Sequence, residues 1–325
     1  VKLTEITIPA SVTTIADSAF EECTGLKRLV FEGDAPVIKE SLPDATVRDN
    51  LDYTVCYRST AKGFSYPEWQ GFRTEIADLD ADSPLITNAI RTEGDYDYFF
   101  HDDGAVIFRY RGNASDVDIP AVLGEKAVIE IGNCAFAGNQ TIVSVKFPDT
   151  VVSIGNRAFE KCKNLTSIQF PSKLERIGSK AFSCCVVLPD HKLPDTLSEI
   201  GAMAFAVCWE LRSFCIPASV RTLESYTFYN SGVQTVYGES NSRLETISQY
   251  AFAQSNLRKI TLPASVRNVT RESFYCHQLQ YLYFEGDAPE DFGENVGRDL
   301  FIICFHQGAK SFTTPQWQGY RTEIW

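Results

Sequence analysis

The stretch Leu165-Thr-Ser-Ile168-Gln-Phe170-Pro171-Ser-Lys-Leu174-Glu-Arg-Ile177-Gly178-Ser-Lys-Ala181-Phe182-Ser-Cys-Cys185 decides the fold. Its Ala-Phe pair recurs along the chain, with Thr or Ser twice in place of Ala. The repeated residues are Phe20, Phe136, Phe159, Phe182, Phe205, Phe228, Phe252 and Phe274. From Phe136 onward the steps are 23, 23, 23, 23, 24 and 22 residues. A fixed step of this size predicts a solenoid of stacked coils.

Each part of the repeat has a predicted place in its coil. The alternating end of Leu-x-x-Ile-x-Phe has the period of a half-buried strand. A Pro follows and ends the strand, because it has no N–H for a ladder; it stands eleven residues before the repeat Phe in six coils, at Pro9, Pro148, Pro171, Pro194, Pro217 and Pro263. Ile-Gly then permits a tight corner. We expect Ala-Phe to form a short helical or 3-10 turn that places the Phe inside.

The repeat resembles the BspA-like (treponemal-type) leucine-rich repeat family of bacterial cell-surface proteins. The family pattern Leu-x-x-Ile-x-Ile-Pro-x-x-Val-x-x-Ile-Gly-x-x-Ala-Phe-x-x-Cys-x-x-Leu is matched at 3–26, 142–165 and 165–188. The resemblance covers about residues 1–33 and 119–286. It implies a leucine-rich repeat solenoid, surface display and adhesion. Two coils depart from the pattern: 186–194 has Asp190-His191-Lys192 at a strand centre, and 233–241 lacks the Pro.

A second duplication marks the ends of two repeat arrays. Phe31-Glu-Gly-Asp-Ala-Pro36 recurs as Phe284-Glu-Gly-Asp-Ala-Pro289, and the segment around Trp69 recurs around Trp317. Because a solenoid needs atypical terminal units, we interpret 31–76 and 284–325 as two copies of one C-terminal cap. The two Trp are expected to fill these caps, and sugar stacking is the alternative role.

The predicted domains follow from these ends. Residues 1–76 are the C-terminal end of a first array with its cap, and they read as the tail of a longer array. Residues 84–325 are a second array, with an N-terminal hairpin cap at 84–120, repeats at 121–286 and a C-terminal cap at 287–325. The acidic stretch 77–83 between them is a solvated linker. Its alternating Asp78, Asp80 and Asp82 suit calcium, but Ser83 and Ala89 stand where an EF-hand needs Gly and Glu.

Composition narrows the classes of function. The chain has 325 residues, 44% hydrophobic, and a formal charge of −12. This acidity disfavours nucleic acid and anionic membrane surfaces as partners. No apolar run is long enough to span a bilayer, so we expect no membrane insertion within this chain.

The sequence offers little chemistry. We find no P-loop, dinucleotide glycine motif, H-E-x-x-H or G-x-S-x-G elbow. His101 beside Asp102-Asp103 suggests a base with an acid, but adjacent residues seldom converge on one substrate atom. Cys23, Cys162, Cys185 and Cys208 each follow a repeat Phe by three residues and read as a column of buried free thiols. We therefore predict no enzyme, cofactor or metal.

The surface that remains is the face of the predicted strands, where residues between the apolar ones point outward. This stripe begins polar and basic and ends rich in Tyr, a residue that favours interfaces. The candidate ligand-binding residues are Lys146, Gln169, Lys192, Tyr237, Lys259, Tyr281 and Tyr283. The alternative is a solvated sheet face whose tyrosines merely cover their neighbours.

We thus expect a secreted or surface-anchored bacterial repeat protein that binds a protein or extracellular-matrix ligand through this face. Two alternatives stay open. One is a structural spacer within a longer surface protein, and the other is a glycan-binding module that uses Trp69 and Trp317.

Overall fold

The computed structural model describes residues 4–16, 19–20, 26–39, 54–64, 68–69, 72–76, 90–101, 104–239, 241–297 and 301–325. Two compact units divide the chain, residues 1–92 with 97–99 and residues 93–96 with 100–325. The predicted linker 77–83, with Asp78, Asp80 and Asp82, lies outside the described residues, as do Cys23, Asp102 and Asp103.

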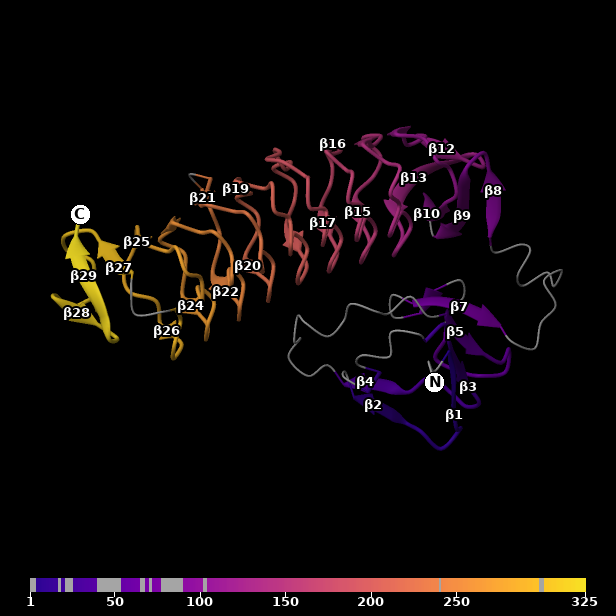
Figure 1. Cartoon of the computed structure of the whole chain (residues 1–325), viewed down its shortest axis with the longest axis horizontal. Helices are drawn as coiled ribbons and strands as arrows, with labels where there is room; N and C mark the ends of the chain where they lie inside the picture. Colours follow the sequence, from indigo (N-terminus) through magenta and orange to yellow (C-terminus); the bar gives the residue numbers. More distant parts are fainter. Residues whose placement is uncertain are drawn as a thin grey trace. The chain divides into compact units, whose positions relative to one another are not determined.

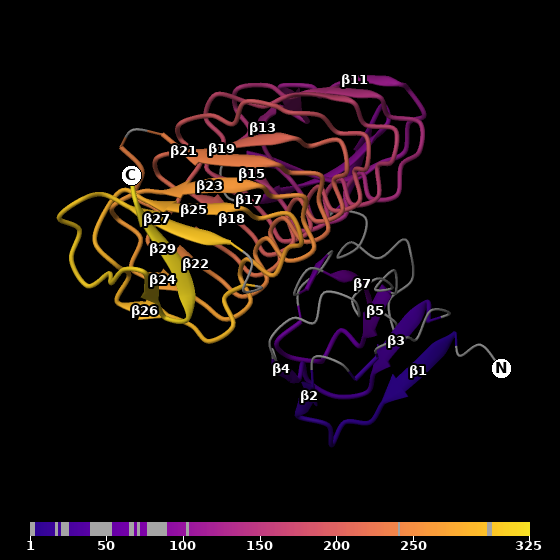
Figure 2. The same cartoon turned by 60° about the vertical axis from the view of Figure 1, so that its left-hand side comes forward.

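The second unit is a ladder of coils whose front strands stack in parallel (Figure 1). A three-stranded sheet comprises β11 (Asp116–Asp118), β14 (Ser144–Lys146) and β16 (Ser167–Gln169). A seven-stranded sheet follows in the order β19 (Ser213–Ile216), β21 (Thr235–Gly238), β23 (Lys259–Leu262), β25 (Tyr281–Phe284), β27 (Ile302–Phe305), β29 (Tyr320–Ile324) and β28 (Gln316–Trp317). Figure 2 shows β21, β23, β25 and β27 side by side.

Strands on a second side of the coils form two further sheets. One contains β8 (Arg91–Glu93), β9 (Tyr96–His101), β10 (Gly104–Tyr110), β13 (Lys126–Ile131), β15 (Ser153–Ile154), β17 (Arg176–Ile177) and β18 (Glu199–Ile200), with β12 (Val122–Leu123) against β13. The other contains β20 (Thr222–Leu223), β22 (Thr246–Ile247), β24 (Asn268–Val269) and β26 (Asp291–Phe292). Parallel pairing holds the coils in register from one to the next.

The first unit repeats this arrangement on a smaller scale. Its main sheet has the order β1 (Glu5–Ile8), β3 (Arg28–Phe31), β5 (Thr54–Tyr57), β7 (Phe72–Ile76) and β6 (Glu68–Trp69). A second pair joins β2 (Thr14–Ala16) to β4 (Val37–Lys39). The core between them is apolar and is centred on Ile8, Leu29, Phe31, Val55 and Tyr57.

One column of phenylalanines runs through the second unit. The seven rings from Phe136 to Phe274 are almost entirely buried. Consecutive rings stack with centroids 4.8–6.0 Å apart and planes within 12° of parallel. This spacing is close to the roughly 4.8 Å between neighbouring strands. One Phe per coil therefore fills the interior at the pitch that the strand ladders set, which confirms the predicted leucine-rich repeat solenoid.

The expected helical or 3-10 turn around this Phe is wrong, because the described residues contain only turns there. The residues two positions before and two positions after the Phe have left-handed backbone, as at Arg157 (φ 57°) and Lys161 (φ 61°) around Phe159. A helix cannot contain them. Because the backbone alternates between left-handed and right-handed conformations, every second N–H points toward the next coil. The N–H groups of Arg157, Phe159 and Lys161 therefore donate to the carbonyls of Ser179, Ala181 and Ser183 at 2.8 Å.

The duplicated segments end their sheets in the same way. In each, the last strand pairs antiparallel with a two-residue strand, β7 with β6 and β29 with β28. The shared Gly-Asp has a physical reason. A Cβ on Gly33 or Gly286 would lie 2.7 Å from the Cα of an Ala in the preceding coil. Asp34 and Asp287 accept hydrogen bonds from the N–H groups of Lys62 and Lys310, at 2.8 and 2.7 Å.

We predict that Phe182→Ala lowers the free energy of unfolding by about 3–5 kcal/mol, because neighbouring coils on both sides surround the cavity. Chemical denaturation checks this value. The matched control is Tyr237→Ala, at a side chain 48% exposed, which should change stability by about 0.5 kcal/mol or less. Equal losses in the two variants would contradict the stacked core.

Candidate binding surface

We define the strand face as the outward side chains of the front strands, namely β11, β14, β16, β19, β21, β23, β25, β27 and β29, and of the coil 186–194 between β16 and β19. The structure places all seven predicted binding residues on the front of the coils, although Lys192 lies where no strand is assigned. Lys146, Gln169, Lys192 and Lys259 are exposed, and Tyr283 is half-buried. Tyr237 and Tyr281 keep 48% and 36% of their surface exposed.

The strand face carries an aromatic cluster at its C-terminal end. The rings of Tyr281 and Tyr283 lie 5.8 Å apart on β25, and Tyr283 meets Trp325 edge-on at 5.3 Å. His306 lies 4.2 Å from the Trp325 ring, which is 51% exposed. The sequence did not lead us to predict Trp325 as a binding residue. The two copies of the duplicated segment do differ at this position, because Thr322-Glu-Ile is followed by Trp and Thr74-Glu-Ile by Ala.

Of the three lysines, Lys259 borders the aromatic cluster, and Lys146 lies at the other end of the strand face. Lys146 on β14 lies 3.8 Å from Asp118 on β11, so part of its charge is offset. Gln169 stands beside Lys146 in register on the three-stranded sheet. Lys259 on β23 is in register with Tyr281 on β25. The strand face therefore has a polar N-terminal half and an aromatic C-terminal half.

Two cysteines on the strand face are protonated at neutral pH. Burial, with the nearby Glu239, raises the pKa of the half-buried Cys215. Burial, with Glu323, raises the pKa of Cys304 to about 11. Burial likewise raises the pKa of Tyr283. The strand face thus offers a neutral thiol at Cys215 and a neutral hydroxyl at Tyr283, whereas Cys304 is buried.

The interior thiols form a column beside the phenylalanines. Cys162, Cys185 and Cys208 are fully buried and unbridged. Each donates to the carbonyl of the Phe one coil earlier, at 3.2 Å. Burial raises the pKa of Cys162 to about 12 and that of Cys185 well above its usual range. A protonated, enclosed sulfur is a poor nucleophile and metal ligand.

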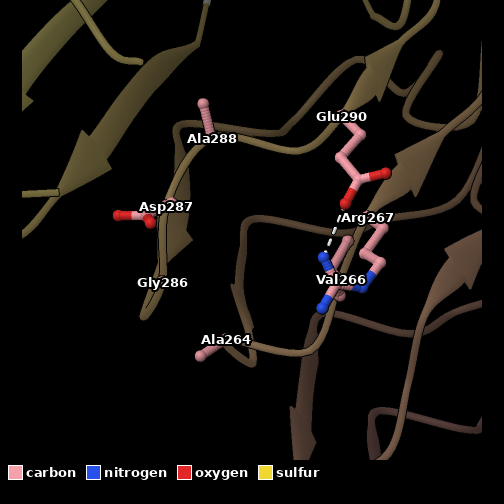
Figure 3. A pocket seen from close by; sticks show the side chains of 7 residues that line it. All are labelled: Ala264, Val266, Arg267, Gly286, Asp287, Ala288 and Glu290. Atoms are coloured by element: carbon pink, nitrogen blue, oxygen red, sulfur yellow. Dashed lines mark hydrogen bonds and ion pairs between the residues drawn. The ribbon is translucent and has the colours of Figure 1, made fainter. Parts of the chain in front are cut away.

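The hollow in Figure 3 offers little chemistry. It measures about 320 Å³ and is lined by Ala264, Val266, Arg267, Gly286, Asp287, Ala288 and Glu290. Arg267 and Glu290 form an ion pair across it at 2.6 Å. Asp287 accepts the N–H of Lys310. Its ionic groups thus tie coils together, whereas a binding site needs polar groups that converge on a ligand.

The tryptophan role in sugar stacking finds no support at Trp317. This ring is 9% exposed and packs 4.7 Å from Phe292 and 4.8 Å from Phe312. It therefore fills the end of the array, as the packing interpretation expects. The side chain of Trp69 lies outside the described residues. Two other exposed aromatics, Trp209 and Tyr275, lie away from the strand face and were missed in the sequence.

Within the described part of the chain, no group of three His, Cys, Asp or Glu side chains is placed to hold a metal ion. Those residues also include no helix long and apolar enough to cross a bilayer. His101 is exposed at the end of β9. The strand face is therefore the surface on which a function is best sought.

The repeats of this chain are similar to those of known proteins. The family model for the BspA type leucine rich repeat region matches in six copies, over residues 1–42, 104–234 and 234–295. A search of curated proteins returned no match. Similar solved structures include the T. pallidum leucine rich repeat protein, at 28% identity over 61% of this chain and 83% of that one, with a TM-score of 0.46. A leucine rich cell surface protein of Faecalibacterium prausnitzii is 24% identical over 69% and 75%, with a TM-score of 0.45.

We expect the interior thiols of the folded chain to resist a thiol reagent at pH 8, as peptide mapping by mass spectrometry would show. Cys215, partly exposed, is the internal control and should be labelled first. Folded thiols stay protonated where unfolded ones ionise, near pH 9, so stability should fall as pH rises past that value. Rapid labelling of Cys185 in the folded chain would contradict the buried column.

Proposed function

The chain belongs to the BspA-type leucine-rich repeat family, and from this premise we propose that it binds another protein through the strand face. We further propose that it is a bacterial protein displayed at the cell surface or secreted, as the family resemblance implies. Its ligand is then a host or matrix protein, and its action is adhesion without catalysis.

The observation that carries this proposal is the exposed aromatic cluster. Tyr and Trp provide large contact areas at low cost in side-chain entropy, and interfaces are enriched in them. A folded array has no packing need to leave Tyr281 and Trp325 in solvent, because its core is filled by one Phe per coil. Repeat proteins commonly bind along such an extended face.

The charge distribution supports a protein ligand over a simple anion. The chain carries −12 overall, yet Lys146, Lys192 and Lys259 all stand exposed on the front of the coils. A lysine at the rim of an aromatic patch, as Lys259 is beside Tyr281, steers an approaching partner and sets its orientation more than it adds affinity.

The test is a triple variant of the full chain, Tyr237→Ala with Tyr281→Ala and Tyr283→Ala. A partner is first captured from extracellular matrix and mucus, identified, and purified for affinity measurement. We expect the triple variant to lose at least about 30-fold in affinity, the effect of removing a hot spot of 2 kcal/mol. Its melting temperature should stay close to that of the unaltered chain, because two of the three rings are exposed.

The control is Trp209→Ala with Tyr275→Ala, which removes exposed aromatic area away from the strand face. This variant should bind as the unaltered chain does. If the triple variant binds unchanged, the strand face is the wrong surface. If the unaltered chain captures no partner, a spacer role replaces binding.

A further inference from the structure

The strand face is interrupted at the coil of residues 186–194. No strand is assigned at 189–193, so β16 and β19 end separate sheets. In a regular coil two successive N–H groups donate to one carbonyl of the coil before. Thr166 and Ser167 bond in this way to the carbonyl of Val143, at 2.9 and 3.1 Å.

In the interrupted coil, a side-chain acceptor replaces the backbone carbonyl of this ladder. Pro189 stands where Thr166 stands one coil earlier, and it has no N–H to donate. The N–H groups of Arg212 and Ser213, from the following coil, bond to Oδ1 of Asp190 at 2.6 and 2.8 Å. The carbonyl of Pro189 pairs instead with Nδ1 of His191 at 3.0 Å.

His191 occupies the inward position that Ile168 and Phe214 fill in the neighbouring coils. Its ring lies among Phe170, Phe205 and Phe214, at 5.2, 5.5 and 6.3 Å. Because Nδ1 donates to a carbonyl, Nε2 carries the lone pair. Although the residue as a whole is partly exposed, Nε2 is buried and no described protein group bonds to it.

The charges around the ring are few. The neighbouring coils present phenyl rings, and the charge that acts on His191 is Asp190 of its own coil. The guanidinium of Arg212 pairs with Glu210 at 3.2 Å, and Lys192 is exposed. Burial lowers the pKa of His191, opposed by the bond to Pro189 and by Asp190. An unfolded imidazole then takes a proton at a higher pH than the folded one, so stability falls as pH drops through 6.5.

We propose that the coil 186–194 is a pH-sensitive joint in the array. A proton on Nε2 of His191 puts a charged N–H among three phenyl rings, and the coil opens to let water reach it. The coils on either side keep their backbone ladders and stay folded. Mild acid thereby separates the polar half of the strand face from its aromatic half.

Hydrogen exchange on the full chain tests the joint, at pH 7.5, 6.5 and 5.5 with rates corrected for intrinsic exchange. Opening of residues 186–216 should increase by up to about tenfold per pH unit below 6.5, the limit for uptake of one proton. The coils around Phe136 and Phe252 should not follow. His191→Leu should abolish the dependence, whereas the control His277→Leu, at an exposed histidine, should retain it.

The proposal is overturned if the unaltered chain shows no such change, if all coils respond equally, or if His191→Leu keeps the full pH dependence. Should that variant fail to fold, NMR titration of the His191 ring in the unaltered chain decides. A pKa below 6.5 supports the joint. A pKa at or above 6.5 would mean that the rings stabilise the charge, and it would overturn the proposal.

Discussion

The structure depends on one constraint, the match between the spacing of the stacked phenyl rings and the spacing of hydrogen-bonded strands. Rings stack 4.8–6.0 Å apart along the array, and the strands in front of them are about 4.8 Å apart. A coil that places its Phe in this column is in register with both neighbours. A slip of even one residue would take the ring out of the column and the strand out of its ladder together.

This constraint explains why the turns hold the coils together while the outward side chains of the strands can vary. Around each Phe the backbone alternates in handedness, so that N–H groups reach the next coil at about 2.8 Å. Left-handed backbone is costly for residues such as Arg157 and Val207, and these bonds between coils offset the cost. Because ring column and turns hold the coils, the outward side chains of the strands are not needed for stability. They are free to differ from Lys146 at one end to Tyr283 at the other.

The sequence was sufficient to predict the solenoid, because the Phe, Pro and Cys positions recur at one interval that only stacked coils explain. It was not sufficient for the turn, since Ala-Phe fits a helix equally well and backbone handedness is decided by bonds to the next coil. The outward alternation of Tyr281 and Tyr283 could be read directly. The contact of Tyr283 with Trp325 could not, because it joins residues far apart in sequence. His191 looked merely irregular until its ring was found in the core.

The central claim is that the coil of twenty-three residues is the unit of stability. The most direct test deletes one whole coil, residues 142–164, and compares it with a deletion of residues 142–152 alone. Removing the whole coil joins Thr141 to Leu165 in the same register, so the shortened chain should unfold cooperatively with stability near that of the parent. The partial deletion should unfold the array. If both deletions are equally damaging in denaturant unfolding, the coil is not the unit and the account fails.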